Sequence, residues 1–165
     1  MRSILVCVIS FVVIAPALAR FEMKDMSFFC TAEISAGLSF DKIQKKWVSK
    51  TFNADQKFVM RMKYLQTRTV KNAIGSDESA IDFNVTITKS GRNFASPCTY
   101  SGWGDKQEPV TVNNLDVFGC ISSLSRYLVN SSTNKFLETY TGEYVHRDDG
   151  GDTPYVTGGT CTRID

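Results

Sequence analysis

The stretch of residues 81–88 constrains the fold more than any other part of the sequence. It reads Ile-Asp-Phe-Asn-Val-Thr-Ile-Thr, so apolar and polar residues alternate without an exception. Successive side chains of a β-strand point to opposite faces, so this pattern predicts a strand with one buried and one solvated face. Strands of this kind belong to antiparallel sheets, because parallel sheets are covered on both faces.

Other segments of the chain can supply neighbours for this strand. Strand-like segments lie at 26–34, 47–52, 57–64, 110–113, 117–122, 127–129, 136–140 and 155–162. Residues 35–37 are expected to end the first strand, and residues 66–79 to form a loop or one short helix. Gly158-Gly159 predicts a bulge or kink in the last strand. We therefore expect an all-β fold, a small antiparallel barrel or sandwich of eight or nine short strands, stapled by disulfides.

The N-terminal residues have the features of an export signal. A positive start at Arg2 precedes the apolar run 4–14 and the small-residue site Ala17-Leu18-Ala19. The run is too short to span a bilayer, which favours a cleaved signal peptide over a retained anchor. We expect residues 1–19 to be the signal peptide and residues 20–165 to be a single β domain. The mature chain would then be secreted or periplasmic, without a membrane span.

Four cysteines follow the expected signal peptide, namely Cys30, Cys98, Cys120 and Cys161. An even number in an exported chain indicates two disulfides, and three connectivities are possible. We favour Cys30–Cys161, which would join the terminal strands, and Cys98–Cys120, which would staple a turn-rich segment. No pair has the spacing of a metal knuckle or a redox motif.

Charge is distributed unevenly along the chain. Residues 20–75 hold 11 Lys/Arg against 5 Asp/Glu, and residues 76–165 hold 7 against 12. The two halves either pack with complementary faces or present a basic surface to an acidic envelope polymer or lipid head group. Nucleic acid is excluded as a partner, because no basic run has interleaved aromatics. Asn84 and Asn130 begin glycosylation sequons, which matter only in a eukaryotic secretory pathway.

The loop after Cys98 is the best candidate for a binding surface. It places Tyr100, Ser101, Trp103 and Lys106 in a polar, glycine-bounded segment. Aromatic side chains on a stapled loop are typical of recognition surfaces, because they offer a large rigid contact area. The alternative is that one ring folds back to cap an end of the barrel. The expected partner is an unknown protein or envelope component.

Enzymatic residues are difficult to assemble from this sequence, so we expect a binding module rather than an enzyme. The alternative function is a cell-envelope hydrolase that would use His146 and the acidic turn of Asp148, Asp149 and Asp152. The same turn could hold Ca²⁺ only weakly, because it lacks the ligand series of a dedicated calcium loop. We expect no catalytic residue, metal or cofactor.

Several short motifs resemble a family of small exported bacterial proteins of unknown function. They are Gly37-Leu38-Ser39-Phe40-Asp41, Lys46-Trp47, Phe52, Lys57-Phe58, Cys98, Cys120, Phe136-Leu137, Tyr140, Tyr144, Asp152-Thr153-Pro154-Tyr155 and Gly159-Thr160-Cys161. More remotely, an exported barrel tied by terminal cysteines is similar to the periplasmic inhibitors of C-type lysozyme. Those inhibitors place a Ser-Gly loop and a lysine in the cleft of the enzyme. Ser101-Gly102 and Lys106 correspond loosely to these groups, and the resemblance implies an inhibitory role.

Overall fold

The computed structural model describes residues 22–72, 74–100, 108–112, 116–142, 144 and 152–165. Within these ranges the chain forms ten β-strands and no helix, and therefore no helix long and apolar enough to cross a membrane. The strands are β1 (Met26–Asp41), β2 (Lys46–Thr51), β3 (Lys57–Lys71), β4 (Asp77–Lys89), β5 (Ser96–Cys98), β6 (Val110–Val112), β7 (Val117–Ser122), β8 (Ser125–Asn130), β9 (Lys135–Tyr140) and β10 (Tyr155–Arg163). The all-β, antiparallel, disulfide-linked fold is confirmed, with ten strands instead of eight or nine.

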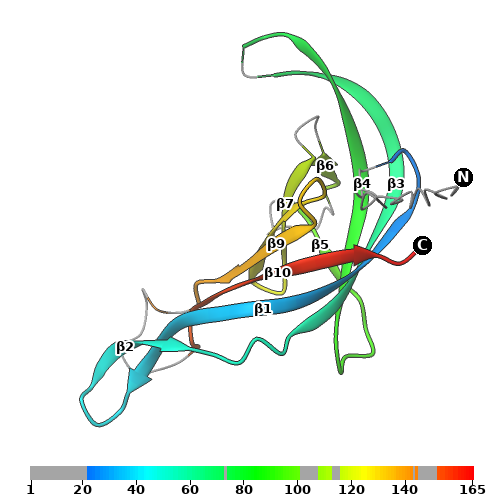
Figure 1. The fold of residues 1–165 in the computed structure, drawn as a ribbon. Coiled ribbons are helices and arrows are strands. Elements are labelled where there is room, and N and C mark those ends of the chain that lie inside the picture. The colour runs from blue at the N-terminus through cyan, green and yellow to red at the C-terminus, as the bar shows by residue number, and fades with distance from the viewer. Residues whose placement is uncertain (1–21, 73, 101–107, 113–115, 143, 145–151) are drawn as a thin grey trace, which may run out of the picture.

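The strands form one antiparallel sheet that curves strongly (Figure 1). Its order is β5-β4-β3-β1-β10-β9-β8-β7, with β2 beside β1 and β6 beside β4. The ladder is open, but its two ends meet at one isolated bridge between Thr99 and Ile121, which exchange two backbone hydrogen bonds of 3.0 and 2.8 Å. The Cys98–Cys120 disulfide lies beside this bridge. In the described part of the chain, this bridge, the disulfide and a hydrogen bond of 3.3 Å from the Ser123 to the Ser96 hydroxyl therefore connect the two ends of the sheet.

Strand β1 organises the sheet, because it has partners along both edges. β10 pairs with residues 28–37 on one edge, while β3 and then β2 pair with successive parts of the other. The expected break at residues 35–37 is wrong for this reason: β1 continues to Asp41. Gly37 fits there because a Cβ atom would collide with the carbonyl oxygen of Pro154. The connection 52–56 runs along β1 where β2 gives way to β3, with Phe52 N donating to Ser35 O.

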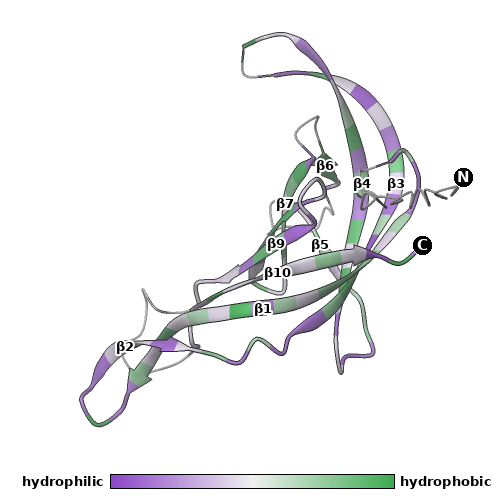
Figure 2. Cartoon of the chain, viewed as in Figure 1, coloured by the Kyte–Doolittle hydropathy of each residue, from purple (hydrophilic) through white to green (hydrophobic). Residues whose placement is uncertain are grey.

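The expectation of a loop or short helix at residues 66–79 is also wrong, because β3 and β4 continue as a long hairpin. Register pairs reach Lys71 opposite Asp77, well beyond the sheet that surrounds the core. Figure 1 shows this hairpin curving away at the top, while the β1–β2 hairpin projects at the lower left. Hydrophobic and hydrophilic positions alternate along both strands (Figure 2). Residues 66–71 of β3 are mostly polar and exposed, so pairing with β4, and not an apolar pattern, keeps this end of the hairpin in strand conformation.

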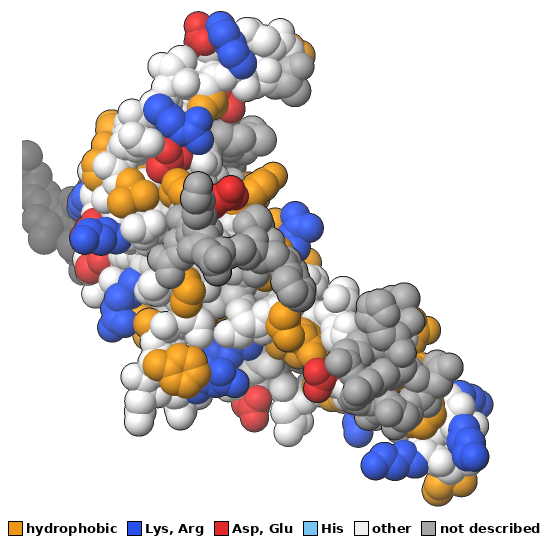
Figure 3. Space-filling model, turned by 180° about the vertical axis from the view of Figure 1, so that it is seen from behind, with side chains coloured by type: hydrophobic (Ala, Val, Ile, Leu, Met, Phe, Trp, Pro, Cys, Tyr) orange, Lys and Arg blue, Asp and Glu red, His pale blue; other side chains and the backbone are white. Residues whose placement is uncertain are grey.

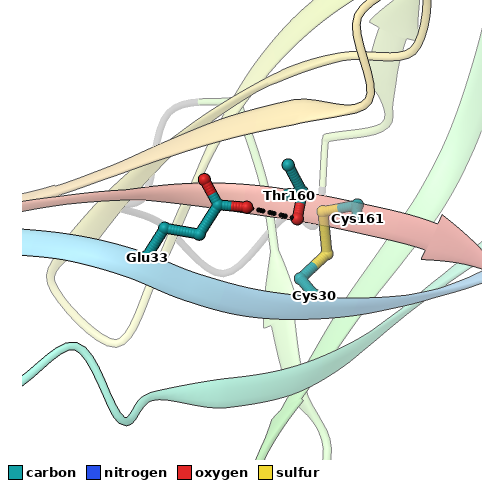
Figure 4. The surroundings of a disulfide bond; sticks show 4 residues. All are labelled: Cys30, Glu33, Thr160 and Cys161. Carbon is teal, nitrogen blue, oxygen red and sulfur yellow. Dashed lines mark hydrogen bonds between the residues drawn. A yellow bond between two sulfur atoms is a disulfide. The ribbon is translucent and has the colours of Figure 1, made fainter.

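The terminal strands are joined by the predicted Cys30–Cys161 disulfide, which links β1 to β10 (Figure 4). The irregularity expected at Gly158-Gly159 lies on the partner strand, where Glu33 is the extra residue of a bulge in β1. Its carboxylate accepts a hydrogen bond of 2.7 Å from the Thr160 hydroxyl. Both predicted disulfides are confirmed, and such bonds are typical of proteins from an oxidising compartment outside the cytoplasm.

The hydrophobic core lies on the concave face of the sheet. The predicted alternation of 81–88 is confirmed for Phe83, Val85 and Ile87, which are buried there. Asp82 departs from the expectation of a solvated face, because it is only 1% exposed. The alternation within β4 is unbroken, so Asp82 lies on the face opposite to Phe83; the bulge at this level adds Leu65 to the neighbouring strand β3.

Polar side chains cover and satisfy the buried Asp82 carboxylate. Arg68 Nε and Gln66 Nε2 donate to Oδ2 at 2.7 and 2.9 Å, and Thr111 donates to Oδ1 at 2.8 Å. Burial acts to raise the pKa of Asp82, but these hydrogen bonds and the charge of Arg68 outweigh it and hold the pKa below its usual value. Asp82 is therefore a structural ion that fastens β4 to β3 and β6.

Candidate functional site

A row of buried polar residues crosses the concave face of the sheet. Tyr127 on β8 pairs with Glu138 on β9, Glu138 with Thr157 on β10, and Thr157 with Ser35 on β1. All four are buried, and the Ser35 and Thr157 hydroxyls lie 2.8 Å apart. The next inward-facing row on the same strands is apolar and contains Phe136 and Val129. The interior is therefore divided into an apolar layer and this polar row.

Glu138 is the centre of the polar row. Its side chain is fully buried, and Oε1 accepts hydrogen bonds of 2.7 Å from Lys89 Nζ and from the Tyr155 hydroxyl. Lys89 is the last residue of β4, so this ion pair crosses the concave space between distant strands. The Lys89 ammonium also lies 5.9 Å from the ring centroid of Tyr127. A buried carboxylate needs such a partner, because an isolated ion in the interior is very costly.

Two polar atoms of this cluster are left without a partner. Within the described residues, neither Oε2 of Glu138 nor the Tyr127 hydroxyl meets the geometry of a hydrogen bond. Burial, and then the nearby Glu138 charge, raises the pKa of Tyr127 well above its ordinary value. Burial also raises the pKa of Tyr155. Both phenols therefore stay protonated at neutral pH and act as hydrogen-bond donors or acceptors, not as nucleophiles.

A cavity of about 490 Å³ opens over the polar row, within the size range of ligand sites. It is lined by Ser35, Phe52, Asn53, Gln56, Lys89, Arg92, Ser123, Ser125, Tyr140, Asp152, Thr153 and Tyr155. We call this the polar cavity. Most of its lining side chains carry a neutral hydroxyl or amide, and three are aromatic.

Each charged group of the polar cavity has a contact, but only Lys89 is paired with an opposite charge. Lys89 is paired with Glu138, and Asp152 accepts a hydrogen bond of 2.6 Å from the Tyr140 hydroxyl. The guanidinium of Arg92 lies 5.6 Å from the ring centroid of Phe94.

The wall of the polar cavity is stiffened by two tyrosines, because the rings of Tyr140 and Tyr155 are stacked with centroids 5.5 Å apart. Gln56 adds an unsatisfied group: its Oε1 is buried and has no hydrogen-bond partner among the described residues. The site therefore combines the Tyr140–Tyr155 wall with one buried amide oxygen, Oε1 of Gln56, that lacks a donor.

A second hollow, of about 510 Å³, lies on the other side of the connection 52–56. Its wall includes Ile34, Ala54, Leu137 and Val156, which are mainly apolar. Ile34, Leu137 and Val156 are exposed on the convex face of the sheet. This hollow lacks the buried polar groups that distinguish the polar cavity.

Of the site residues predicted from sequence, the structure describes Tyr100 and Asp152. Tyr100 is 72% exposed and lies outside the polar cavity, beside the Thr99–Ile121 bridge. Ser101, Trp103 and Lys106 lie outside the described residues, as do His146, Asp148 and Asp149. Asp152 belongs to the cavity rim. Among the described residues no group of three potential metal ligands occurs.

Sequence reasoning missed the central residues Lys89, Glu138 and Tyr155. A signal for Glu138 was present, because Phe136, Glu138 and Tyr140 share one face of the same strand by simple alternation. A charged residue on the face that carries Phe136 is expected to be buried and paired. No comparable signal marks Lys89, whose partner lies 49 residues away. Comparisons with protein-family models, curated proteins and solved structures found no match for this chain.

Proposed function

We propose that the protein is an exported, non-enzymatic binding module and that its ligand occupies the polar cavity. Export is supported by the two disulfides and by the signal-like residues at the N-terminus. A binding role, as opposed to catalysis, is supported by the protonated phenols and by the pairing of Lys89 with Glu138 at the cavity. The observation that carries the proposal is the polar cavity itself, which holds about 490 Å³ and is lined mainly by hydroxyl and amide groups.

The chemistry of the lining favours a neutral, polyhydroxylated ligand, which we infer to be a short saccharide. Hydroxyl and amide groups from Ser35, Asn53, Gln56, Ser125 and Thr153 offer both donors and acceptors at short spacing. The Tyr140–Tyr155 wall offers an apolar aromatic surface, and such mixed walls are typical of ligand sites. A strongly charged ligand would have to compete with Lys89 or Glu138 for its partner, and so weaken or break this ion pair.

The proposal is tested by titrating the oxidised protein with neutral saccharides and recording amide chemical shifts. We expect shifts at the amides of the polar cavity and a dissociation constant that rises by about tenfold or more in Asn53→Ala/Gln56→Ala. Asn84→Ala is the matched control, because Asn84 is exposed on β4 away from the cavity. Shifts confined to other surfaces, or equal effects of both variants, would refute the cavity as the ligand site.

Two other roles remain as alternatives to be tested. The exposure of Tyr100 supports a contact with a protein partner through its loop, as an inhibitor would make. The position of Asp152 on the cavity rim supports the hydrolase that was the alternative from sequence. Hydrolysis of a bound saccharide that is lost in Asp152→Asn would favour the hydrolase over the binding module.

A further inference from the structure

The two long hairpins end in turns that are alike in one respect. The β1–β2 turn carries Ile43, which is 94% exposed, and the β3–β4 turn carries Ile74, which is 86% exposed. These turns lie at opposite ends of the molecule (Figure 1). A large apolar side chain at such exposure contributes nothing to the core, so each turn is a candidate contact with another molecule.

The two turns differ in charge. Lys42, Lys45 and Lys46 are exposed at the end of the β1–β2 hairpin, and none of them forms an ion pair within the described residues. At the other tip, Lys71 is neutralised by Asp77 at 2.7 Å. Figure 3 shows Lys and Arg side chains gathered around the β1–β2 tip at the lower right, with a hydrophobic side chain among them. At the other tip, basic and acidic side chains lie next to each other.

The β1–β2 tip is also held in shape. Asp41 Oδ1 accepts hydrogen bonds of 2.9 and 3.0 Å from the amides of Ile43 and Gln44, so the carboxylate of Asp41 is used inside the turn. Phe40 and Trp47 stack edge to face at the base of the turn, with centroids 5.4 Å apart. The hairpin therefore presents Ile43 and its flanking lysines on a preformed end.

We propose that this tip docks the protein on the surface of an anionic lipid bilayer. The lysines meet lipid phosphates, and Ile43 enters the boundary between head groups and acyl chains. Each lysine near an anionic surface strengthens binding by about fivefold. The exposed isoleucine selects a bilayer over a soluble polyanion, because a polyanion in water offers no apolar region to receive it. The docking surface is separate from the polar cavity and does not depend on its ligand.

The experiment is vesicle co-sedimentation with the oxidised full chain, using phosphatidylcholine vesicles with and without phosphatidylglycerol. Every variant keeps the same N-terminal residues, so any contribution from them is common to all. We expect binding only to the anionic vesicles, a loss of about 25-fold or more in Lys42→Glu/Lys45→Glu, and a loss of about tenfold in Ile43→Ser. Ile74→Ser is the matched control and should bind as the unaltered chain does. High salt should weaken binding, because exposed charges are screened.

Thermal melts of all variants check that the fold is retained, since these side chains touch little of the core. Equal binding to neutral vesicles would overturn the proposal, and so would equal losses from Ile43→Ser and Ile74→Ser. Soluble polyphosphate provides the second arm. If the lysine variants lose binding to polyphosphate and to vesicles alike while Ile43→Ser changes neither, the tip is a polyanion site and the bilayer proposal is wrong.

Discussion

Lys89 Nζ lies 2.7 Å from Oε1 of Glu138, although 49 residues separate the two along the chain. The pair connects the end of β4 to the middle of β9 across the concave side of the sheet. It also fixes the floor of the polar cavity, because Glu138 accepts the hydroxyl of Tyr155 as well. Stability and ligand binding should therefore both depend on this one ion pair.

Lys89→Met should lower the free energy of unfolding by about 3–5 kcal/mol, because it leaves a fully buried carboxylate without its counter-ion. Adding Glu138→Gln to this variant should recover part of the loss, since the uncompensated charge is then gone. Urea unfolding of the two single variants and the double variant measures the coupling. Lys71→Met, which breaks the exposed Lys71–Asp77 pair, should cost less than about 1 kcal/mol. Strict additivity of the Lys89 and Glu138 changes would contradict this account.

Asp82 should make the protein sensitive to acid. Its folded pKa lies below the unfolded value of about 3.9, so the unfolded state binds the proton first as the pH falls. The stabilisation is present at neutral pH and is lost as the pH drops below about 4 and through the folded pKa. Asp82→Asn should reduce stability at pH 7 and flatten this acid dependence, which urea titrations over a pH series would measure. Asp77→Asn, at an exposed pair, should leave the dependence as it was.

The Cys98–Cys120 disulfide should control whether the ends of the sheet stay together. By the loop-entropy relation, replacing both cysteines with serine costs about 3.4 kcal/mol for a sequence separation of 22. Among the described residues the ends are then joined by the Thr99–Ile121 bridge and by a hydrogen bond of 3.3 Å between the Ser123 and Ser96 hydroxyls, so the amides of Thr99 and Ile121 should exchange hydrogen much faster. Replacing Cys30 and Cys161 should cost about 5 kcal/mol for a separation of 131. Amides of the continuous β1–β10 ladder should nevertheless show no such local opening, and a local opening there would contradict the argument.

Tyr100 and Trp103 carry the prediction of a recognition loop. Tyr100 is 72% exposed, so truncating both rings to alanine should leave the melting temperature nearly unchanged. Binding to a protein partner captured through this loop should fall by about tenfold or more. Tyr155→Ala is the contrasting variant, because Tyr155 stacks on Tyr140 and contacts Glu138, and it should lower the melting temperature. A large loss of stability in the loop variant would mean that a ring is packed inside.

The sequence by itself determined the fold class and most of the strand faces, and it favoured the cysteine pairing that forms. Alternation is a local property, so residues 83, 85 and 87 could be assigned to the core without knowing their neighbours. The same alternation placed Glu138 on the face of Phe136, although its meaning was not recognised. An even number of cysteines near strand ends was enough to favour the two disulfides that form.

Only the tertiary structure decided the register, the bulges and the polar cavity. Asp82 is buried against the expectation from its position because Gln66 and Arg68 of β3 and Thr111 of β6 cover it, and only strand pairing brings these residues beside it. Strands include residues 35–37, 66–71 and 77–79 because partner strands are present on the adjacent edges. Pairing between strands is not encoded in any of these segments alone. The polar row depends on four separate strands whose registers align Tyr127, Glu138, Thr157 and Ser35, and Lys89 reaches it only through the curvature of the whole sheet.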